Sequence, residues 1–225
     1  MRLSRQSAAR WGAVAILLGL FAASDPAAAA KKAKAAKPAD DPLRAALDTK
    51  KTPKEKIDYL NDMIEDGKSS KDVYFHLGNA KYEAGDTQGA AAAFEKAVAI
   101  DSTFFKAVMN LAAMYDEQQM FPKAIEAYEM ASRLEPKNAD VWSSLGDTYH
   151  TQKDYGKAQD LYKKALQLDP NNQHALYSMA VAFADAGIFR EAVKYWKRVV
   201  EIDPKTEHGK NASENIDLVK KYLIP

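Results

Sequence analysis

One short pattern recurs in this sequence every 34 residues without an insertion. Ala90, Ala124, Ala158 and Ala192 stand 34 positions apart, and a large aromatic residue follows each alanine four positions later. Sequence self-similarity with a period of about 20 to 50 residues indicates a repeat architecture, in which each unit buries its apolar face against its neighbours. The chain is therefore predicted to contain four similar units, at residues 71–104, 105–138, 139–172 and 173–206.

Each unit contains two runs of apolar residues with helical spacing, separated by a break near Gly85, Gln119, Lys153 and Gly187 in turn. Each unit is therefore predicted to be a helical hairpin, with the glycines in the left-handed conformation that follows a helix. Proline cannot continue a helix, so Pro136, Pro170 and Pro204 predict ends for three second helices. The expected first helices are 71–84, 105–118, 139–152 and 173–186, and the second are 87–100, 121–134, 155–168 and 189–202.

The pattern resembles the tetratricopeptide repeat (TPR) family, and the third unit resembles it most. That unit carries the family's small, aromatic and proline positions in register: Trp142, Leu145, Gly146, Tyr149, Ala158, Tyr162, Ala165 and Pro170. The resemblance implies an all-α fold, a right-handed α-solenoid of stacked hairpins in which Trp142 packs at a joint between helices. The first unit departs from the family because Lys81 replaces the first-helix tyrosine, which predicts a looser first joint.

A stacked array exposes an apolar face at each end, so helical caps are expected on both sides of the repeats. Residues 42–70 are predicted to form an N-terminal capping region, and a degenerate fifth repeat is the alternative. Residues 207–225 are predicted to form a C-terminal capping helix, because an apolar stripe there has helical spacing: Ala212, Ile216, Val219 and Leu223.

The N-terminus has the pattern of an export signal. Three arginines precede an uncharged run at 11–23, and small residues follow, which predicts a signal peptide at 1–30 and a periplasmic or extracellular protein. The run is short for a bilayer span, but an uncleaved inner-membrane anchor is the alternative. Residues 31–41 are rich in lysine and alanine and are predicted to be a flexible linker.

Composition narrows the function classes. The chain of 225 residues has no cysteine, which excludes thiolate metal sites and thiol nucleophiles. Its formal net charge is +1, and residues 71–225 carry 19 basic and 22 acidic residues, so nucleic acid is not an expected partner. The sequence shows no phosphate-binding loop, metal-ligand pair on one helix or nucleophile motif. We therefore expect no catalytic residue, no metal and no cofactor.

The resemblance also implies where a partner would bind, because first helices line the concave surface in TPR proteins. Acidic residues outnumber the single lysine at the matching positions, and aromatic residues and a methionine stand among them. The groove is therefore expected to bind a basic and apolar protein segment. The candidate residues are Asp72, Phe75, His76, Asn79, Tyr82, Glu83, Lys106, Met109, Asn110, Asp116, Glu117, Asp140, Ser143, Asp147, His150, His174, Tyr177 and Asp185.

Taken together, the sequence predicts a non-catalytic protein-interaction scaffold or adaptor of the bacterial envelope. Two alternatives from other classes stay open: a structural subunit that assembles with itself, and an enzyme whose site is built across repeats. A concentration-independent monomer would count against the first, and a closed pocket with a buried carboxylate or histidine would favour the second.

Overall fold

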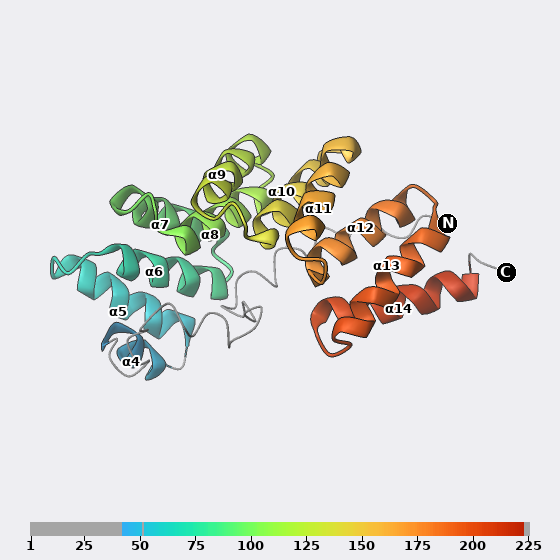
Figure 1. The fold of residues 1–225 in the computed structure, drawn as a ribbon. Coiled ribbons are helices and arrows are strands. Elements are labelled where there is room, and N and C mark those ends of the chain that lie inside the picture. The colour runs from blue at the N-terminus through green and yellow to red at the C-terminus, as the bar shows by residue number, and fades with distance from the viewer. Residues whose placement is uncertain (1–41, 51, 223–225) are drawn as a thin grey trace, which may run out of the picture. The chain divides into compact units, whose positions relative to one another are not determined.

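A computed structural model describes residues 42–50 and 52–222, in which every regular element is an α-helix. The predicted signal peptide at 1–30, its alternative as an anchor at 11–23 and the linker at 31–41 lie outside these residues. The helices are α4 (Pro42–Asp48), α5 (Pro53–Glu65), α6 (Lys71–Glu83), α7 (Thr87–Ile100), α8 (Phe105–Glu117), α9 (Phe121–Leu134), α10 (Ala139–Thr151), α11 (Tyr155–Leu168), α12 (Gln173–Asp185), α13 (Phe189–Ile202) and α14 (Glu207–Tyr222) (Figure 1).

The eight predicted repeat helices are confirmed. The four second helices have the predicted bounds, and each first helix ends one residue earlier than predicted. All four breaks have the left-handed backbone, with φ of 83° at Gly85, 60° at Gln119, 67° at Lys153 and 76° at Gly187. Gln119 and Lys153 adopt it despite their side chains, which makes this conformation more costly there than at the two glycines.

The chain divides into two compact units, and the boundary falls after Gln118, inside the second repeat. In the N-terminal unit, α5 packs on α6, α6 on α7 and α7 on α8 (Figure 1). Phe94 is fully buried, and a Cβ on Gly78 would lie 2.5 Å from its ring, so only glycine allows α6 and α7 this close. The small residue of this hairpin therefore packs directly against its ring.

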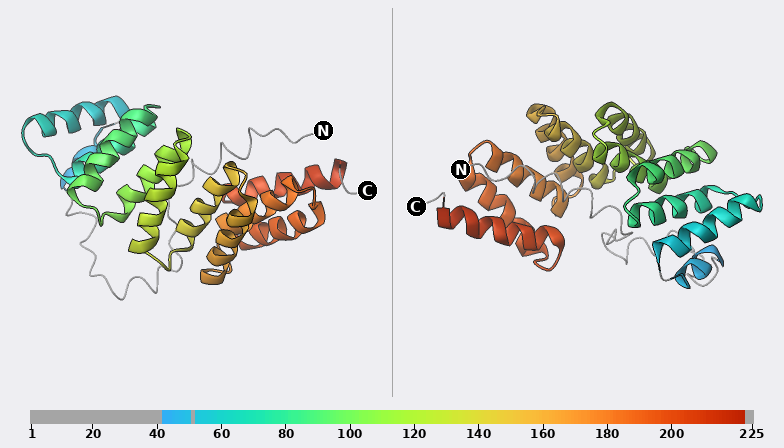
Figure 2. Two further views of the ribbon diagram at one scale, coloured as in Figure 1. Left: turned by 90° about the horizontal axis from the view of Figure 1, so that it is seen from above. Right: turned by 180° about the vertical axis from the view of Figure 1, so that it is seen from behind.

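In the C-terminal unit, the hairpins α10–α11 and α12–α13 pack in the same manner, and α14 lies beside α13 in all three views (Figures 1 and 2). Gly146 faces the Tyr162 ring as Gly78 faces Phe94. A core cluster surrounds Trp196 and joins α12, α13 and α14. Three of the four stripe residues of the predicted cap, Ala212, Ile216 and Val219, lie in this cluster, and Leu223 is outside the described residues.

Trp142 is less central than the sequence indicated. Its ring is half-buried beside Ala139, Ala165 and Ala175, and its Nε1–H donates to the carbonyl of Pro136 at 3.0 Å. The Lys164 ammonium lies 3.2 Å from the ring centroid, so one face of the indole is turned to a charged side chain and not to the core. Among the described residues, no helix combines the length and apolar content that crossing a bilayer requires.

Candidate functional site

The candidate residues of the N-terminal unit stand on α6 and α8, the first helices of two repeats. Exposed side chains there are Asp72, Glu83, Lys106 and Glu117. Half-buried ones are Phe75, His76, Asn79, Tyr82 and Asp116. These faces therefore combine accessible carboxylates with partly covered rings.

Two residues expected on this surface belong to the interior instead. Met109 is 1% exposed and Asn110 is 7% exposed, so the prediction of Met109 as an exposed apolar anchor is wrong. The Asn110 amide donates to the Asn79 side-chain oxygen at 3.1 Å and links α8 to α6. Phe75 also contributes to packing, since its ring lies against Phe94 and Phe104 with centroids 5.9 and 5.1 Å apart.

The acidic side chains on α6 and α8 differ in how their charge is compensated. Glu83 forms an ion pair with Lys56 of α5 at 2.7 Å. Glu117, by contrast, accepts a hydrogen bond from the Thr87 hydroxyl at 3.4 Å and another from the Tyr82 hydroxyl. Burial, the negative charge of Glu117 and this hydrogen bond together raise the pKa of Tyr82, so the phenol stays neutral. The two hydroxyl donors thus leave the negative charge of Glu117 in place.

The candidate residues of the C-terminal unit form a connected polar network between α10 and α12. Asp147 accepts from the Tyr162 hydroxyl at 2.8 Å, and its other oxygen lies 2.5 Å from Nε2 of His174. Nδ1 of His174 lies 3.1 Å from the Ser143 hydroxyl, and Asp140 accepts from Asn172 at 2.7 Å. The structure therefore brings Ser143, Asp147 and His174 together, which the sequence placed only on a common face.

Asp147 and His174 form a charged pair. Burial acts to raise the pKa of Asp147, but the charge of His174 and hydrogen bonds from His174, Ser178 and Tyr162 lower it below its ordinary 3.8. Burial acts to lower the pKa of His174, but the charge and hydrogen bond of Asp147, with the charge of Asp140, raise it above 6.5. While His174 is protonated, Asp147 is therefore compensated and adds little negative charge to the surface.

The order serine, histidine, aspartate resembles a hydrolase triad, but these groups cannot act as one. Ser143 is 0% exposed, and its hydroxyl lies 3.2 and 3.1 Å from the backbone carbonyls of Ala139 and Asp140. A protonated His174 has N–H donors on both ring nitrogens, so it cannot accept the serine proton. The network holds helices together and supplies no accessible nucleophile.

The network continues onto α14 through residues that the sequence analysis missed. The ring of His208 stacks on His174 with centroids 5.4 Å apart, and its other neighbour is Tyr177 at 5.3 Å. The Asn215 amide donates to the Tyr177 hydroxyl at 3.2 Å. One signal was available, because His208 stands one period of 34 residues after His174.

His208 makes the C-terminal unit sensitive to acid. Burial and then the positive charge of His174 lower the pKa of His208 to about 4, against 6.5 when it is free in water. In the unfolded chain His208 therefore binds a proton below about pH 6.5, whereas in the folded chain it binds one only below about pH 4. Stability should consequently fall by about 3 kcal/mol as the pH drops from 6.5 to 4.

Urea unfolding followed by the fluorescence of Trp142 and Trp196 measures this effect. His208→Phe keeps a ring between His174 and Tyr177. In this variant the free energy of unfolding should lose most of its dependence on pH between about pH 6.5 and 4. The Asp147–His174 pair adds no pH dependence of stability in this range. Its full contribution to stability is present above the pKa of a free carboxyl group and below the pKa of a free imidazole. An equal slope in the variant would contradict the assignment, and His76→Phe in the N-terminal unit is the matched control.

At the edge of the network, His150 on α10 and Asp185 on α12 approach more loosely. The His150 Nε2 and the Asp185 carboxylate are 3.5 Å apart, and the Asp185 side chain is 55% exposed. The His150 ring lies edge-on to Tyr155, with centroids 5.2 Å apart. The Asp185 carboxylate is open to solvent although His150 is largely covered, so the pair contributes little to holding the helices together.

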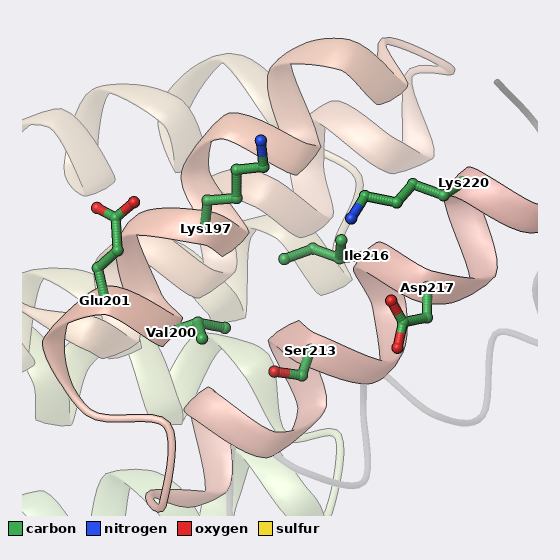
Figure 3. A pocket seen from close by; sticks show the side chains of 7 residues that line it. All are labelled: Lys197, Val200, Glu201, Ser213, Ile216, Asp217 and Lys220. Carbon is green, nitrogen blue, oxygen red and sulfur yellow. The ribbon is translucent and has the colours of Figure 1, made fainter.

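A surface cleft of about 320 Å³ lies between α13 and α14 (Figure 3). Val200 and Ile216 form its apolar part, and two lysines and two acids stand around them: Lys197, Lys220, Glu201 and Asp217. The charges balance, so they select neither an anion nor a cation. Within the described residues, no group of three or more histidine, aspartate or glutamate side chains is arranged to hold a metal ion.

Comparison with known proteins supports the repeat assignment. Family models described as tetratricopeptide repeat match residues 57–103, 81–147, 139–172 and 174–206. The first of these ranges begins inside the predicted capping region at 42–70, although the alanine and aromatic pattern does not extend there. A general transcriptional corepressor, trfA of Dictyostelium discoideum, is 27% identical over 77 residues, which is 34% of this chain and only 6% of that protein.

Solved structures of MamA are similar in fold. One crystal structure of MamA is 26% identical with a TM-score of 0.58, covering 66% of this chain and 87% of that one. MamA from Desulfovibrio magneticus RS-1 is 20% identical with a TM-score of 0.63, covering 73% and 93%. The tetratricopeptide repeat matches and the first of these likenesses support a protein-interaction scaffold as the general role. The chain belongs to the tetratricopeptide repeat family.

Proposed function

We propose that this protein is a scaffold or adaptor of the bacterial envelope, and that α6 and α8 bind a partner segment carrying basic and apolar side chains. The export pattern in residues 1–30 supports the envelope, and the membership in the repeat family supports a protein partner. The N-terminal unit is chosen because Asp147, the central acid of the C-terminal network, is compensated by His174, whereas Glu117 has only hydroxyl donors.

One observation carries the choice of this surface: the exposed carboxylate of Glu117 is oriented by two hydroxyls and keeps its charge beside the half-buried Tyr82 ring. Asp72 adds an exposed carboxylate in the first turn of α6. A cationic side chain of a partner would meet preorganised acids here, and an apolar one would meet the ring. Tyrosine beside charge is a frequent source of binding energy in protein interfaces.

The test captures partners of the full chain from its native cells. Combined Asp72→Asn and Glu117→Gln substitutions remove charge and keep shape, so they should reduce the captured partner several-fold and weaken its dependence on salt. Glu126→Gln with Glu129→Gln, exposed on the second helix α9, is the matched control and should change nothing. If the paired N-terminal substitutions leave both the amount captured and its salt dependence unaltered, the surface is wrongly assigned.

A further inference from the structure

A second cleft, in the N-terminal unit, opens between α5, α6 and α7 and has a volume of about 220 Å³. Its floor is apolar, because Leu77 and Ala93 are 5% and 4% exposed. Ile64 and Tyr74 form half-buried walls. The volume exceeds the roughly 150 Å³ of an apolar cavity that accepts benzene, and it is below the range of about 300–1,000 Å³ typical for drug-sized ligands. The cleft therefore has room for one side chain.

The cleft exists because the first repeat lacks rings that the other repeats carry at equivalent positions. Lys81 corresponds to Tyr115, Tyr149 and Phe183, one, two and three periods later. Ala93 corresponds to Tyr195 of the fourth repeat. Phe183 and Tyr195 stack there with centroids 5.5 Å apart, so two rings occupy the place that is open beside Lys81 and Ala93.

The helix α7 keeps the opening clear. Six of its 14 residues are alanine, and Gly89 and Ala92 line the cleft with almost no side chain. In the third repeat the residue equivalent to Gly89 is Lys157, whose ammonium lies 4.9 Å from the centroid of the Tyr149 ring and covers it. A Cβ on Gly89 would overlap the Asp86 carboxylate and lie 2.8 Å from the Lys81 ammonium, so the glycine leaves room for this ion pair.

The rim of the cleft favours an acidic neighbour. Of the described residues that line it, two are lysines, Lys81 and Lys96, and none is acidic. Lys81 has one loose ion pair, with Asp86 at 3.5 Å, and Lys96 lies 5.3 Å from the centroid of the Tyr74 ring. Both ammonium groups stand next to an apolar floor, where they can meet carboxylates without being buried.

We propose that this cleft binds a single aromatic side chain of a partner protein, from a segment with acidic residues on either side of the ring. The ring takes the place that Tyr149 or Phe183 occupies in its own repeat. Lys81 and Lys96 pair with the flanking carboxylates and lie near the ring, where their charge also interacts with its π face. The site is distinct from the acidic faces of α6 and α8. It selects an acidic segment, whereas those faces bind a basic one.

The experiment titrates the full chain with three acetylated and amidated tripeptides, Glu-Phe-Glu, Glu-Ala-Glu and Lys-Phe-Lys, and follows amide shifts of α5 to α7 by NMR. Glu-Phe-Glu should bind, and each of the others should bind about tenfold more weakly or not at all, because one lacks the ring and the other has the wrong charge. Shifts should centre on Leu77, Ala92 and Ala93. Equal binding of all three peptides, or none by Glu-Phe-Glu, would overturn the proposal.

Lys81→Tyr provides the sharpest variant, because it restores the residue of the second and third repeats. The chain's own ring should then fill the cleft, so Glu-Phe-Glu binding should be lost while the thermal midpoint stays the same or rises. Ala93→Leu, with the leucine that the third repeat carries as Leu161, should fill the floor and have the same effect. Lys163→Tyr, on the exposed side of α11, should leave peptide binding intact. Unchanged Glu-Phe-Glu binding in the two folded cleft variants would refute the site.

Discussion

Replacing Trp196 with alanine should lower the free energy of unfolding of the C-terminal unit by about 3–5 kcal/mol. The indole is 2% exposed and is the largest of the fully buried side chains. It contacts a cluster built from α12, α13 and α14, so its removal opens a cavity that three helices share. Urea unfolding followed by far-ultraviolet circular dichroism, which reports the loss of helix, measures the change.

Trp142→Ala is the matched control for this substitution, since it removes the same side chain from a half-buried place. Its loss should be smaller, about 1–2 kcal/mol, from one hydrogen bond and one cation–π contact. Trp196→Phe should cost far less than Trp196→Ala, because the indole Nε1 has no hydrogen-bond acceptor among the described residues and little polar interaction is lost. Equal losses for the two alanine variants would contradict the position of the core.

Replacing Asp147 with asparagine should destabilise the C-terminal unit by about 3–5 kcal/mol between roughly pH 4 and 6.5. Both partners of the Asp147–His174 pair are charged in this window, because the pKa of the carboxyl is lowered and that of the imidazole is raised. The substitution leaves a protonated His174, 12% exposed, without its counterion. The loss should shrink as the pH rises through the raised pKa of His174, since the folded protein can then keep that histidine neutral.

Asp185→Asn is the control, because its exposed carboxylate lies 3.5 Å from His150 and should contribute less than about 1 kcal/mol. The stability of both variants is compared by urea unfolding at about pH 5.5, where both partners of the pair are charged, and at about pH 8.5, which is above that range. A loss that is equal in the two variants, or that does not depend on pH, would show that the pair does not hold α10 to α12.

The helices and their pairing follow from local features of the sequence. A helical hairpin needs apolar residues at helical spacing, a small residue opposite a ring and a residue that tolerates the turn, and all of these recur within 34 positions. Gly78 with Phe94 and Gly146 with Tyr162 show this contact between a small residue and a ring. The departure at Lys81 also had a structural consequence, because the missing ring corresponds to an open cleft.

The candidate surface was harder to predict, since it depends on neighbours about one repeat away. Asp147 and His174 stand 27 positions apart, Asn79 and Asn110 stand 31 apart, and His208 reaches the network from a further helix. Whether a carboxylate is compensated depends on which side chain the next helix places within about 3 Å, and repeat position does not specify that.

The sequence by itself determined the all-helical repeat architecture, because each of its signals acts within one helix or one hairpin. Only the tertiary structure decided which polar residues remain available to a partner. It buried Met109 and Ser143, neutralised Asp147 with His174, and left the charge of Glu117 beside two hydroxyls. The physical reason is that burial and charge compensation are properties of several helices packed together, and they cannot be assigned to one position in a repeat.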